Sequence, residues 1–457
     1  MAKQSLTQQL AAALTSFDPA DLSADDLRYA RLFVLDWLAS AVAGTATVPG
    51  RMLIEEGRDH GCGVCRVLGI AEGRDADVAT LVNGGLSHIV EMDDLDRGSV
   101  VHPGTVVIPA ALAAAESVDA SGKRFLFAVI AGYEAAIRVG GAVGRSHYRY
   151  WQNTATCGTF GAAVAAGIVL GLDAERLTWA LGNAGSIAGG LWQFNHDGAM
   201  TKHLHAGRAS SNGLLAARLA RNGFTGATEI LEGPQGLFAA MSSDADPARV
   251  TAGLDRGLGA RGCGWKIAGV SIKPHASCRH THPAVDAARE LRNRIGPDLS
   301  GARRVRVETY GTALQVTDAP NPTNTYQAKF SLQYCTAQAL LHGRVGLHDF
   351  APDRLADPAT RDFMSRIDLS VDPEIDAAYP LTWSARVTAE MADGTTETAR
   401  VDAPKGDPEN AVSWDEVVAK LHDLAVGTAF AGDADGIVGD VVGLDERVSM
   451  RGFLPTP

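Results

Sequence analysis

The chain has 457 residues, of which 46% are hydrophobic and 21% are charged. This length exceeds what one hydrophobic core usually supports, so it predicts two domains. The formal net charge is −12, from 41 basic and 53 acidic residues, and no basic block stands out. Because nucleic acid is bound through concentrated positive charge, the composition argues against a nucleic-acid partner.

The N-terminal sequence MAKQSLTQQLAAALTSF lacks the basic region, long apolar run and cleavage site of a signal peptide. Apolar runs such as FGAAVAAGIVLGL fall short of the roughly eighteen residues that a membrane span needs. We therefore expect a cytoplasmic protein with no membrane partner. The six cysteines are scattered, which favours reduced thiols, and the lone Cys62-Gly-Val-Cys65 pair favours ordinary thiols over a zinc or redox site.

The chain up to about residue 265 is rich in Ala, Leu and Gly, with apolar residues at three- and four-residue spacing that predicts helices. Ser23-Ala-Asp-Asp26 resembles an acidic capping box and opens the helical run LRYARLFVLDWLASAVAG, where Gly44 is expected to supply the stop. The many small residues predict closely packed helices. Further helical runs are expected at 123–143, 158–171 and 212–223.

The pattern changes after about Lys266. RRVRVETYG (303–311) alternates and predicts a strand, and residues 382–404 predict two strands joined at Asp393-Gly394, a strong hairpin signal. Between them, residues 330–343 predict a helix.

A helix returns at SWDEVVAKLHDLA (413–425), and we expect it to pack on the first domain. The predicted fold is therefore mainly α with a smaller α+β domain. Residues 1–266 and 405–457 are expected to form the helical domain, and residues 267–404 the smaller domain that interrupts it.

The stretch HIVEMDDLDRGSVVHPG gathers Glu91, Asp93, Asp94 and Asp96 before it closes on His102. Such a set could bind a hard cation, but its spacing matches neither an EF-hand loop nor a metalloprotease motif. We therefore expect no metal. An alternative, that these carboxylates cap a helix start and face solvent, stays open.

His102 stands at a loop-to-helix junction, in VVHPGTVVIPAALAAAE. Helix N-termini carry unpaired N–H groups and favour anions, so an imidazole there can sit beside a bound carboxylate. This setting is typical of an acid/base residue, although a purely structural histidine is the alternative.

Two basic clusters occur in this otherwise acidic protein, at 200–213 and at 271–288, the second near the expected domain junction. Lys and Arg bind carboxylates or phosphates through charge-assisted hydrogen bonds, so the clusters predict an anionic substrate. A solvated basic face is the alternative. The cationic and imidazole side chains are Lys202, His203, His205 and Arg208 in the first cluster, and Lys273, His275, Arg279, His280 and His282 in the second.

Several segments together resemble the MmgE/PrpD family, in family order over nearly the whole chain: EMDDLDRGSVVHPGTVVIPAALAAAE, TATCGTFGAAVAAGIVLGLD, KHLHAGRASSNGLLAARLARNGFTG, SIKPHASCRHTHPAVDA, YQAKFSLQY and GDPENAVSWDEV. The resemblance implies a helical domain built from both chain ends, a smaller α+β domain, and usually a homodimer. It also implies activity on small polycarboxylates without a required metal or organic cofactor. Known family activities include 2-methylcitrate dehydratase, cis-aconitate decarboxylase and iminodisuccinate epimerase.

The resemblance also assigns site residues. His102 matches the histidine of the family's HP element, Lys202 the lysine of K-x-L-H-A-G, and Lys273 the lysine before P-x-x-x-C. These positions line the active site in decarboxylase-like members. The residues expected to bind the substrate are Glu91, Asp93, Asp94, Gln152, Arg279 and His280.

One departure from the family concerns Gln152. Many lyase members carry a histidine two positions before the threonine of TATCG, where this chain has YWQNTATCG. A glutamine can hydrogen-bond but cannot exchange a proton at neutral pH. Tyr150, or else Tyr148, is the expected replacement.

The implied chemistry removes or delivers a proton next to a carboxylate. His102 is the expected acid/base, while Lys202 and Lys273 clamp carboxylates or stabilise the enolate. A cofactor-independent lyase on a small di- or tricarboxylate is the first hypothesis. The alternatives are an epimerase of the iminodisuccinate type, favoured by Gln152, a non-catalytic organic-acid binding protein, and a metal-dependent hydrolase.

Overall fold

A computed structural model describes residues 4–260, 262–296 and 301–456. The chain divides into two compact units. The first comprises Met1–Ile89, Asp93–Val270 and Ser413–Pro457, and the second comprises Val90–Met92 and Ser271–Val412. The boundaries between the units thus lie at 270/271 and 412/413, where the sequence analysis expects 266/267 and 404/405. The grouping of Val90–Met92 with the second unit was not predicted.

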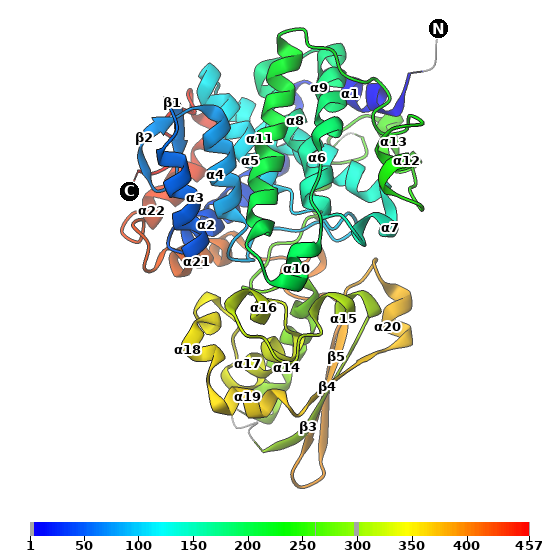
Figure 1. Cartoon of the computed structure of the whole chain (residues 1–457), viewed down its shortest axis with the longest axis vertical. Helices are drawn as coiled ribbons and strands as arrows, with labels where there is room; N and C mark the ends of the chain where they lie inside the picture. The colour runs from blue at the N-terminus through cyan, green and yellow to red at the C-terminus, as the bar shows by residue number, and fades with distance from the viewer. Residues whose placement is uncertain (1–3, 261, 297–300, 457) are drawn as a thin grey trace. The chain divides into compact units, whose positions relative to one another are not determined.

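The first unit is almost entirely helical (Figure 1). Its helices are α1 (Leu6–Ser16), α2 (Ala24–Thr45), α3 (Val48–Arg58), α4 (Ala76–Ser87), α5 (Gly104–Val118), α6 (Gly122–Ala142), α7 (Gly144–Tyr148), α8 (Asn153–Leu170), α9 (Ala174–Ile187), α10 (Gln193–Asp197), α11 (Thr201–Arg221), α12 (Leu237–Met241), α13 (Ala248–Thr251), α21 (Trp414–Ala425) and α22 (Ala434–Val442).

Helix α2 confirms the predicted capping box, because the Ser23 hydroxyl accepts the Asp26 N–H while Asp26 accepts the Ser23 N–H. The predicted role of Gly44 needs correction. The helix runs on to Thr45, and a Cβ on Gly44 would lie 2.2 Å from the carbonyl oxygen of Leu86. Gly44 therefore permits a close approach between α2 and α4 rather than ending the helix.

Helix α8 lies at the core and packs against α5, α6 and α11 (Figure 1). Glycine makes this packing close: a Cβ on Gly161 would lie 2.6 Å from the carbonyl oxygen of Gly132, and a Cβ on Gly213 would lie 2.4 Å from the Cβ of Ala162. Helix α11 begins at Thr201, well before the predicted start at 212, so the first basic cluster is helical. Its first two turns carry Lys202 and His205.

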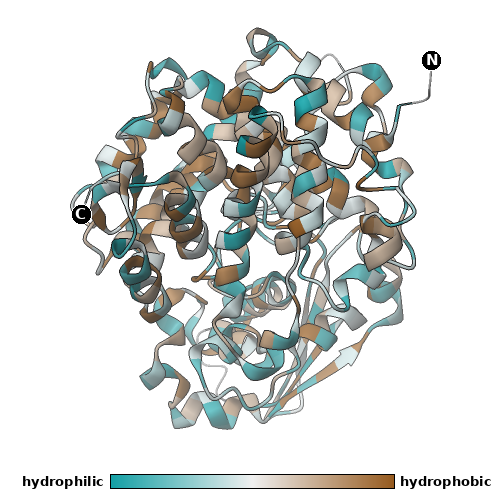
Figure 2. Ribbon diagram, turned by 45° about the horizontal axis from the view of Figure 1, so that its top comes forward, coloured by the Kyte–Doolittle hydropathy of each residue, from teal (hydrophilic) through white to brown (hydrophobic). Residues whose placement is uncertain are grey.

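Helices α6 and α8 are long and apolar enough to cross a membrane, which corrects the expectation that the apolar runs are too short. The most apolar windows of α6 and α8 are 94% and 89% buried within the protein. Their apolar character, visible as brown segments in Figure 2, is thus accounted for by burial in the core of the first unit.

The C-terminal helix α21 packs against α2, as predicted. Lys420 Nζ on α21 pairs with Asp36 Oδ1 on α2 at 2.6 Å, and both side chains are buried. The first unit also contains an unpredicted hairpin of β1 (Cys62–Val67) and β2 (Ile70–Arg74). Burial raises the pKa of the Cys65 thiol to about 11, so the side chain stays a thiol at neutral pH.

The second unit is an α+β structure. Its sheet has the strand order β4 (Ile367–Val371), β3 (Ala302–Thr309), β5 (Ala385–Met391) and β6 (Thr396–Val401). Strands β3 and β4 are parallel and the other pairs are antiparallel. The hairpin predicted at Asp393-Gly394 is confirmed, with Gly394 at φ 87°.

Helix α14 (His282–Ile295) packs against β5, β6 and α17 (Leu332–His342), the helix predicted at 330–343. The unit's other helices are α15 (Gly311–Thr317), α16 (Thr325–Lys329), α18 (Pro352–Leu355), α19 (Pro358–Met364) and α20 (Pro373–Ala378). Together the two units confirm the predicted fold class, a large helical part with a smaller α+β part.

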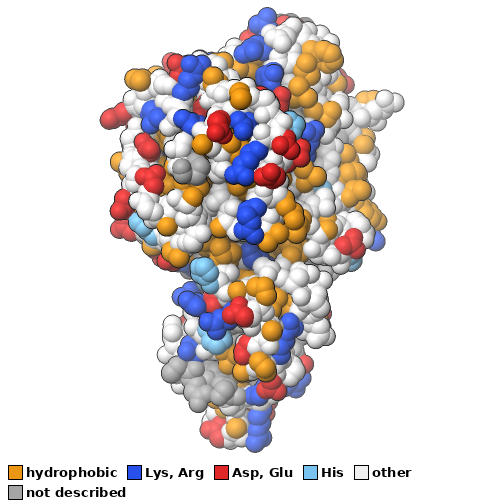
Figure 3. Space-filling view, turned by 60° about the vertical axis from the view of Figure 1, so that its left-hand side comes forward, with side chains coloured by type: hydrophobic (Ala, Val, Ile, Leu, Met, Phe, Trp, Pro, Cys, Tyr) orange, Lys and Arg blue, Asp and Glu red, His pale blue; other side chains and the backbone are white. Residues whose placement is uncertain are grey.

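Charged side chains of both signs lie on the face drawn in Figure 3. Basic and acidic side chains are interspersed over this face, and neither sign forms a continuous field there. The absence of a nucleic-acid partner stays a prediction.

Candidate active site

The loop between α4 and α5 carries most of the predicted acidic residues. Its tip is a tight turn in which Asp96 and Val101 form an isolated β-bridge, and the Asp96 carboxylate accepts the N–H and O–H of Ser99, each at 2.7 Å. Val100 has a φ of 52°, an unfavourable value for a β-branched residue. Asp96 therefore shapes the loop, which returns the chain to His102 directly before α5.

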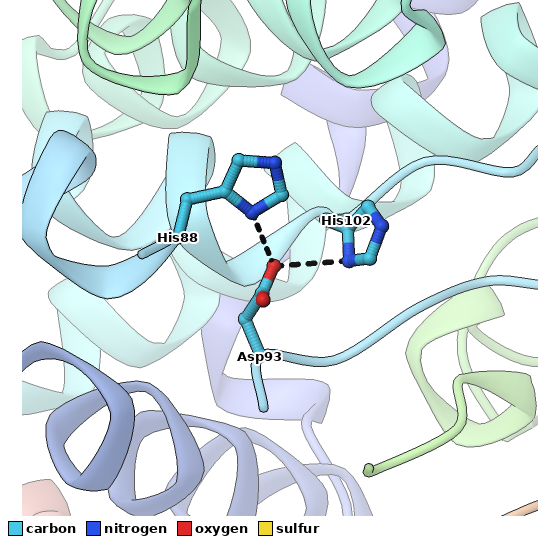
Figure 4. Close-up of side chains that lie close together, drawn as sticks. All are labelled: His88, Asp93 and His102. Carbon is cyan, nitrogen blue, oxygen red and sulfur yellow. Dashed lines mark hydrogen bonds and ion pairs between the residues drawn. The ribbon is translucent and has the colours of Figure 1, made fainter. Parts of the chain in front are cut away.

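Asp93 brings two imidazoles together (Figure 4). Its Oδ2 atom lies 2.7 Å from Nδ1 of His88 and 2.9 Å from Nδ1 of His102. The centroids of the two rings are 4.9 Å apart. The side chains of His88, Asp93 and His102 are 0%, 2% and 12% exposed. One carboxylate oxygen therefore orients both histidines.

The tautomer of His102 follows from its neighbours. Its Nδ1 atom also lies 2.6 Å from the carbonyl oxygen of Asp94, which can only accept a hydrogen bond. The proton of neutral His102 is thus on Nδ1, and Nε2 is the basic nitrogen. The backbone N–H of His102 donates to the Thr154 hydroxyl at 3.0 Å, which fixes the ring's attachment point.

Asp94 connects this loop to the start of α5. Its carboxylate accepts the Gly104 N–H at 3.0 Å and the Tyr133 hydroxyl at 2.6 Å, while burial raises its pKa well above the ordinary value. A Cβ on Gly104 would lie 2.7 Å from the Tyr133 oxygen, so only glycine fits there. These contacts give Asp94 a positioning role, and its contact with substrate stays a prediction.

Gln152 directly precedes α8 and is 2% exposed. Its Nε2 lies 3.2 Å from His88 Nε2, and its Oε1 lies 2.7 Å from Nδ1 of His205 on α11. The sequence reasoning missed both histidines as site members. His88 was within the acidic stretch and His205 within the first basic cluster, but nothing local showed that Gln152 joins them.

The imidazoles beside Gln152 are those of His88 and His205. Tyr150 is 58% exposed, with the Arg149 guanidinium over its ring at 5.2 Å, and Tyr148 packs edge-on against Trp192. The replacement of the missing imidazole by Tyr150, or else by Tyr148, stays a prediction.

Lys202 lies in the first turn of α11 and is 3% exposed, in the same unit as His102. Burial lowers the pKa of His205 to about 4, and the charge of Lys202 acts in the same direction. His205 is therefore neutral at pH 7, next to a buried cation.

Lys273 and Glu91 form a buried ion pair in the second unit, with Nζ and Oε2 3.3 Å apart. Glu91 has a φ of 60°, rare for a residue other than glycine, and Lys329 Nζ donates to the carbonyl of the adjacent Val90 at 2.8 Å. The two lysines thus hold the short segment Val90–Met92 through charge and hydrogen bonding.

Arg279 and His280 are engaged within the second unit. Arg279 pairs with Asp407 and donates to the carbonyl oxygen of Lys405 at 3.0 Å. His280 contacts the Tyr310 hydroxyl at 2.8 Å and stacks on Trp383 with ring centroids 4.3 Å apart. These contacts are structural, and the expected binding of substrate by either residue stays a prediction.

The donor atoms of His88, Asp93 and His102 lie close enough to hold a metal ion, all within 4.8 Å of one another. Two imidazoles and a carboxylate are a common transition-metal set. Both Nδ1 atoms, however, face hydrogen-bond acceptors at 2.6–2.9 Å and would have to release protons to bind a metal. The geometry fits a hydrogen-bond network better than a metal centre.

Comparison with known proteins finds two family domains in this chain. The MmgE/PrpD N-terminal domain matches residues 8–250 and the MmgE/PrpD C-terminal domain matches residues 275–438. The cis-aconitate decarboxylase-like protein oryM of Aspergillus oryzae is 29% identical over an alignment of 447 residues that covers 92% of this chain and 90% of that protein. A cis-aconitate decarboxylase of Aspergillus terreus is 26% identical, covering 99% of this chain and 96% of its own length.

The human cis-aconitate decarboxylase is 24% identical over an alignment of 437 residues that covers 92% of this chain and 88% of that protein. The two domain matches together span both units, and the relatives align over almost their whole length. The chain belongs to the MmgE/PrpD family.

Proposed function

We propose that the protein is a cofactor-independent lyase that acts on a small di- or tricarboxylate by proton transfer at the carbon next to a carboxylate. The observation that carries the proposal is the setting of His102. Asp93 and the Asp94 carbonyl hold its Nδ1–H, which leaves Nε2 as a base in a mostly buried site.

Two lyase reactions are compatible with this base. In a dehydration, Nε2 of His102 removes the proton, and the resulting enolate expels the hydroxyl group from the neighbouring carbon. In a decarboxylation, Nε2 of His102 first takes up a proton from water. The bond to the carboxylate carbon then breaks, carbon dioxide leaves, and Nε2 delivers that proton to the carbanion. Asp93 stabilises the imidazolium in either case, because its charge is 2.9 Å from Nδ1.

The substrate class follows from the buried cations and from the relatives. Lys202 lies in the same unit as His102 and would hold one substrate carboxylate by a charge-assisted hydrogen bond. The relatives named cis-aconitate decarboxylase support a small polycarboxylate with a carbon–carbon double bond or a hydroxyl group.

An epimerase of the iminodisuccinate type is the second candidate. It is favoured by Gln152, which stands where many lyase members carry a histidine and cannot exchange a proton. An epimerase returns a proton to the opposite face of the same carbon and expels no group, so it needs no acid to protonate a leaving group.

Proton NMR in D₂O tests both candidates, with 2-methylcitrate, cis-aconitate and iminodisuccinate as substrates. A new alkene or a decarboxylated product supports the lyase. Deuterium entering a stereocentre without elimination supports the epimerase. Binding without either change would contradict both, and loss of activity after chelator treatment would contradict the cofactor-independent mechanism.

A further inference from the structure

We propose that Gln152 locks the tautomers of the histidine network: its amide holds His88 neutral with the proton on Nδ1, and so keeps the Asp93 charge available to His102. His88, Gln152 and His205 are then positioning residues for the base. This inference deepens the proposed function and rests on it for the role of His102.

The donor and acceptor types force each link. Asp93 as a carboxylate only accepts, so Nδ1 of His88, 2.7 Å away, must donate. The Nε2 atom of a neutral His88 is then an acceptor, and the atom facing it at 3.2 Å must be the amide nitrogen of Gln152. The amide oxygen consequently faces Nδ1 of His205 at 2.7 Å and accepts its proton.

The opposite amide orientation would change the charge at Asp93. With the amide oxygen facing His88, Nε2 of His88 would need a proton of its own while Nδ1 still donates to Asp93. His88 would then be a cation 2.7 Å from the Asp93 carboxylate and would compensate its charge. The His102 imidazolium that forms during proton transfer would lose that stabilisation.

His205 selects the amide orientation. Burial lowers the pKa of His205 to about 4, so the ring is neutral and carries one N–H. In the proposed tautomer this N–H is on Nδ1, the nitrogen that faces the amide, and it donates to the amide oxygen. The charged and titratable groups around His88 are Asp93 and His102 on its own loop, and His205 and Lys202 on α11.

The surroundings hold the amide and His205 in place. The backbone N–H of Gln152 donates to the Gly190 carbonyl at 2.9 Å, and Gly190 has a φ of 149°. A Cβ on Gly190 would lie 2.5 Å from the Ala155 Cβ and 3.2 Å from Nδ1 of His205. Phe194 packs edge-on against the His205 ring, with centroids 5.2 Å apart. The network is therefore pre-organised before substrate binds.

The test is nitrogen NMR of the substrate-free protein with ¹⁵N-labelled histidine at pH 7. Signals are assigned by their loss in His88→Asn, His102→Asn and His205→Asn. We expect all three histidines to be neutral with the proton on Nδ1, the less common tautomer of a free imidazole. A wild-type His88 that is cationic, or that carries its proton on Nε2, would overturn the proposal without any variant of Gln152.

Gln152→Glu provides the second measurement, because it keeps the shape and replaces the amide donor by an acceptor. We expect His88 to become doubly protonated at pH 7, and kcat to fall about tenfold to a hundredfold with KM changed by less than about threefold. Gln315→Glu makes the same change at an exposed position of α15 and should alter neither.

The two proposals fail separately. If the tautomers are as expected and none of the three substrates reacts, the proposed role of Gln152 is supported and the lyase and epimerase proposals are both wrong. If a substrate reacts but Gln152→Glu leaves the His88 signals unchanged, the proposed role of Gln152 is wrong and the proposed function is supported.

Discussion

The histidine network of the first unit and the buried cations of the second unit use charge in different ways. In the first unit, one carboxylate, that of Asp93, is shared by the imidazoles of His88 and His102. In the second unit, each buried cation has a carboxylate as its counter-charge, Glu91 for Lys273 and Asp407 for Arg279. Proton transfer and ion pairing therefore use different side chains in the two units.

This difference predicts how each region fails. Changes in the histidine network should lower turnover while the protein stays folded. Changes in the buried cations of the second unit should lower stability, because a buried charge that loses its counter-charge costs more than the pair contributed. We expect the loss of activity or stability to be largest for His102 and smallest for Tyr150.

His102→Ala should give the largest loss. Removing the base should lower kcat by about 10³-fold, with a modest change in KM, because general acid–base catalysis typically contributes 10² to 10⁴. Steady-state kinetics with the substrate identified by NMR provides the measurement. His60→Ala, a change at an exposed histidine, is the control. Turnover within tenfold of wild type would remove His102 from the mechanism.

Asp93→Asn should follow, with a loss of about 10²-fold in kcat, since an amide offers one acceptor atom and a donor where two imidazole N–H groups need an acceptor. Circular dichroism and the unfolding midpoint should stay near wild type if the region serves turnover rather than folding. Asp353→Asn on the surface is the matched control. A fully unfolded Asp93→Asn protein would break the contrast between the two regions.

Lys273→Met should act mainly on stability. The variant leaves Glu91 buried and charged, which costs roughly 3–5 kcal/mol. Adding Glu91→Gln to it should restore much of the denaturant midpoint, while substrate affinity stays low if Lys273 binds a carboxylate. Equal midpoints for the single and double variants would show that the Lys273–Glu91 pair, 3.3 Å apart, is not coupled.

Glu116→Gln should change how stability depends on pH. Burial raises the pKa of Glu116 from 4.5 to about 8, so between these values the folded state keeps a proton that the unfolded state has released. The contribution of Glu116 to the free energy of unfolding is fully present below pH 4.5. It is lost as the pH rises towards 8, by a few kcal/mol at most. The free energy of unfolding of Glu116→Gln, relative to that of wild type, should therefore be higher at pH 8 than at pH 5. The exposed Glu175→Gln should show no such difference.

Tyr150→Phe should have the smallest effect. The ring is 58% exposed, so we expect kcat and KM within about twofold of wild type. A tenfold fall in kcat would return Tyr150 to the mechanism and extend the proton-handling region to the surface.

The predictable parts of the fold depended on local signals. The capping box at Ser23 and the Asp393-Gly394 turn act over a few residues, and both were predicted correctly. Strand β4 and the β1–β2 hairpin were missed. Strand β4 is short and pairs in parallel with β3 across some sixty residues, and such long-range pairing leaves little trace in the local pattern.

The candidate site divides in the same way. His102 and Asp93 lie in one conspicuous stretch, so their proximity could be anticipated from the sequence. His205 joins the network through Gln152, which lies 53 residues away from it in the chain. His88 contacts Asp93 directly and Gln152 at a separation of 64 residues. A neutral amide gives no chemical signal of its own, and its importance depends on the packing of α4, α8 and α11.

The ion pair of Asp36 and Lys420 forms late in the protein's synthesis. The two residues are 384 positions apart, and both side chains are buried in the first unit. On the ribosome, α2 emerges long before α21, so Asp36 stays solvated in an incompletely packed helix until α21 has been made. The second unit can thus complete its fold before α21 packs on α2 and completes this part of the core.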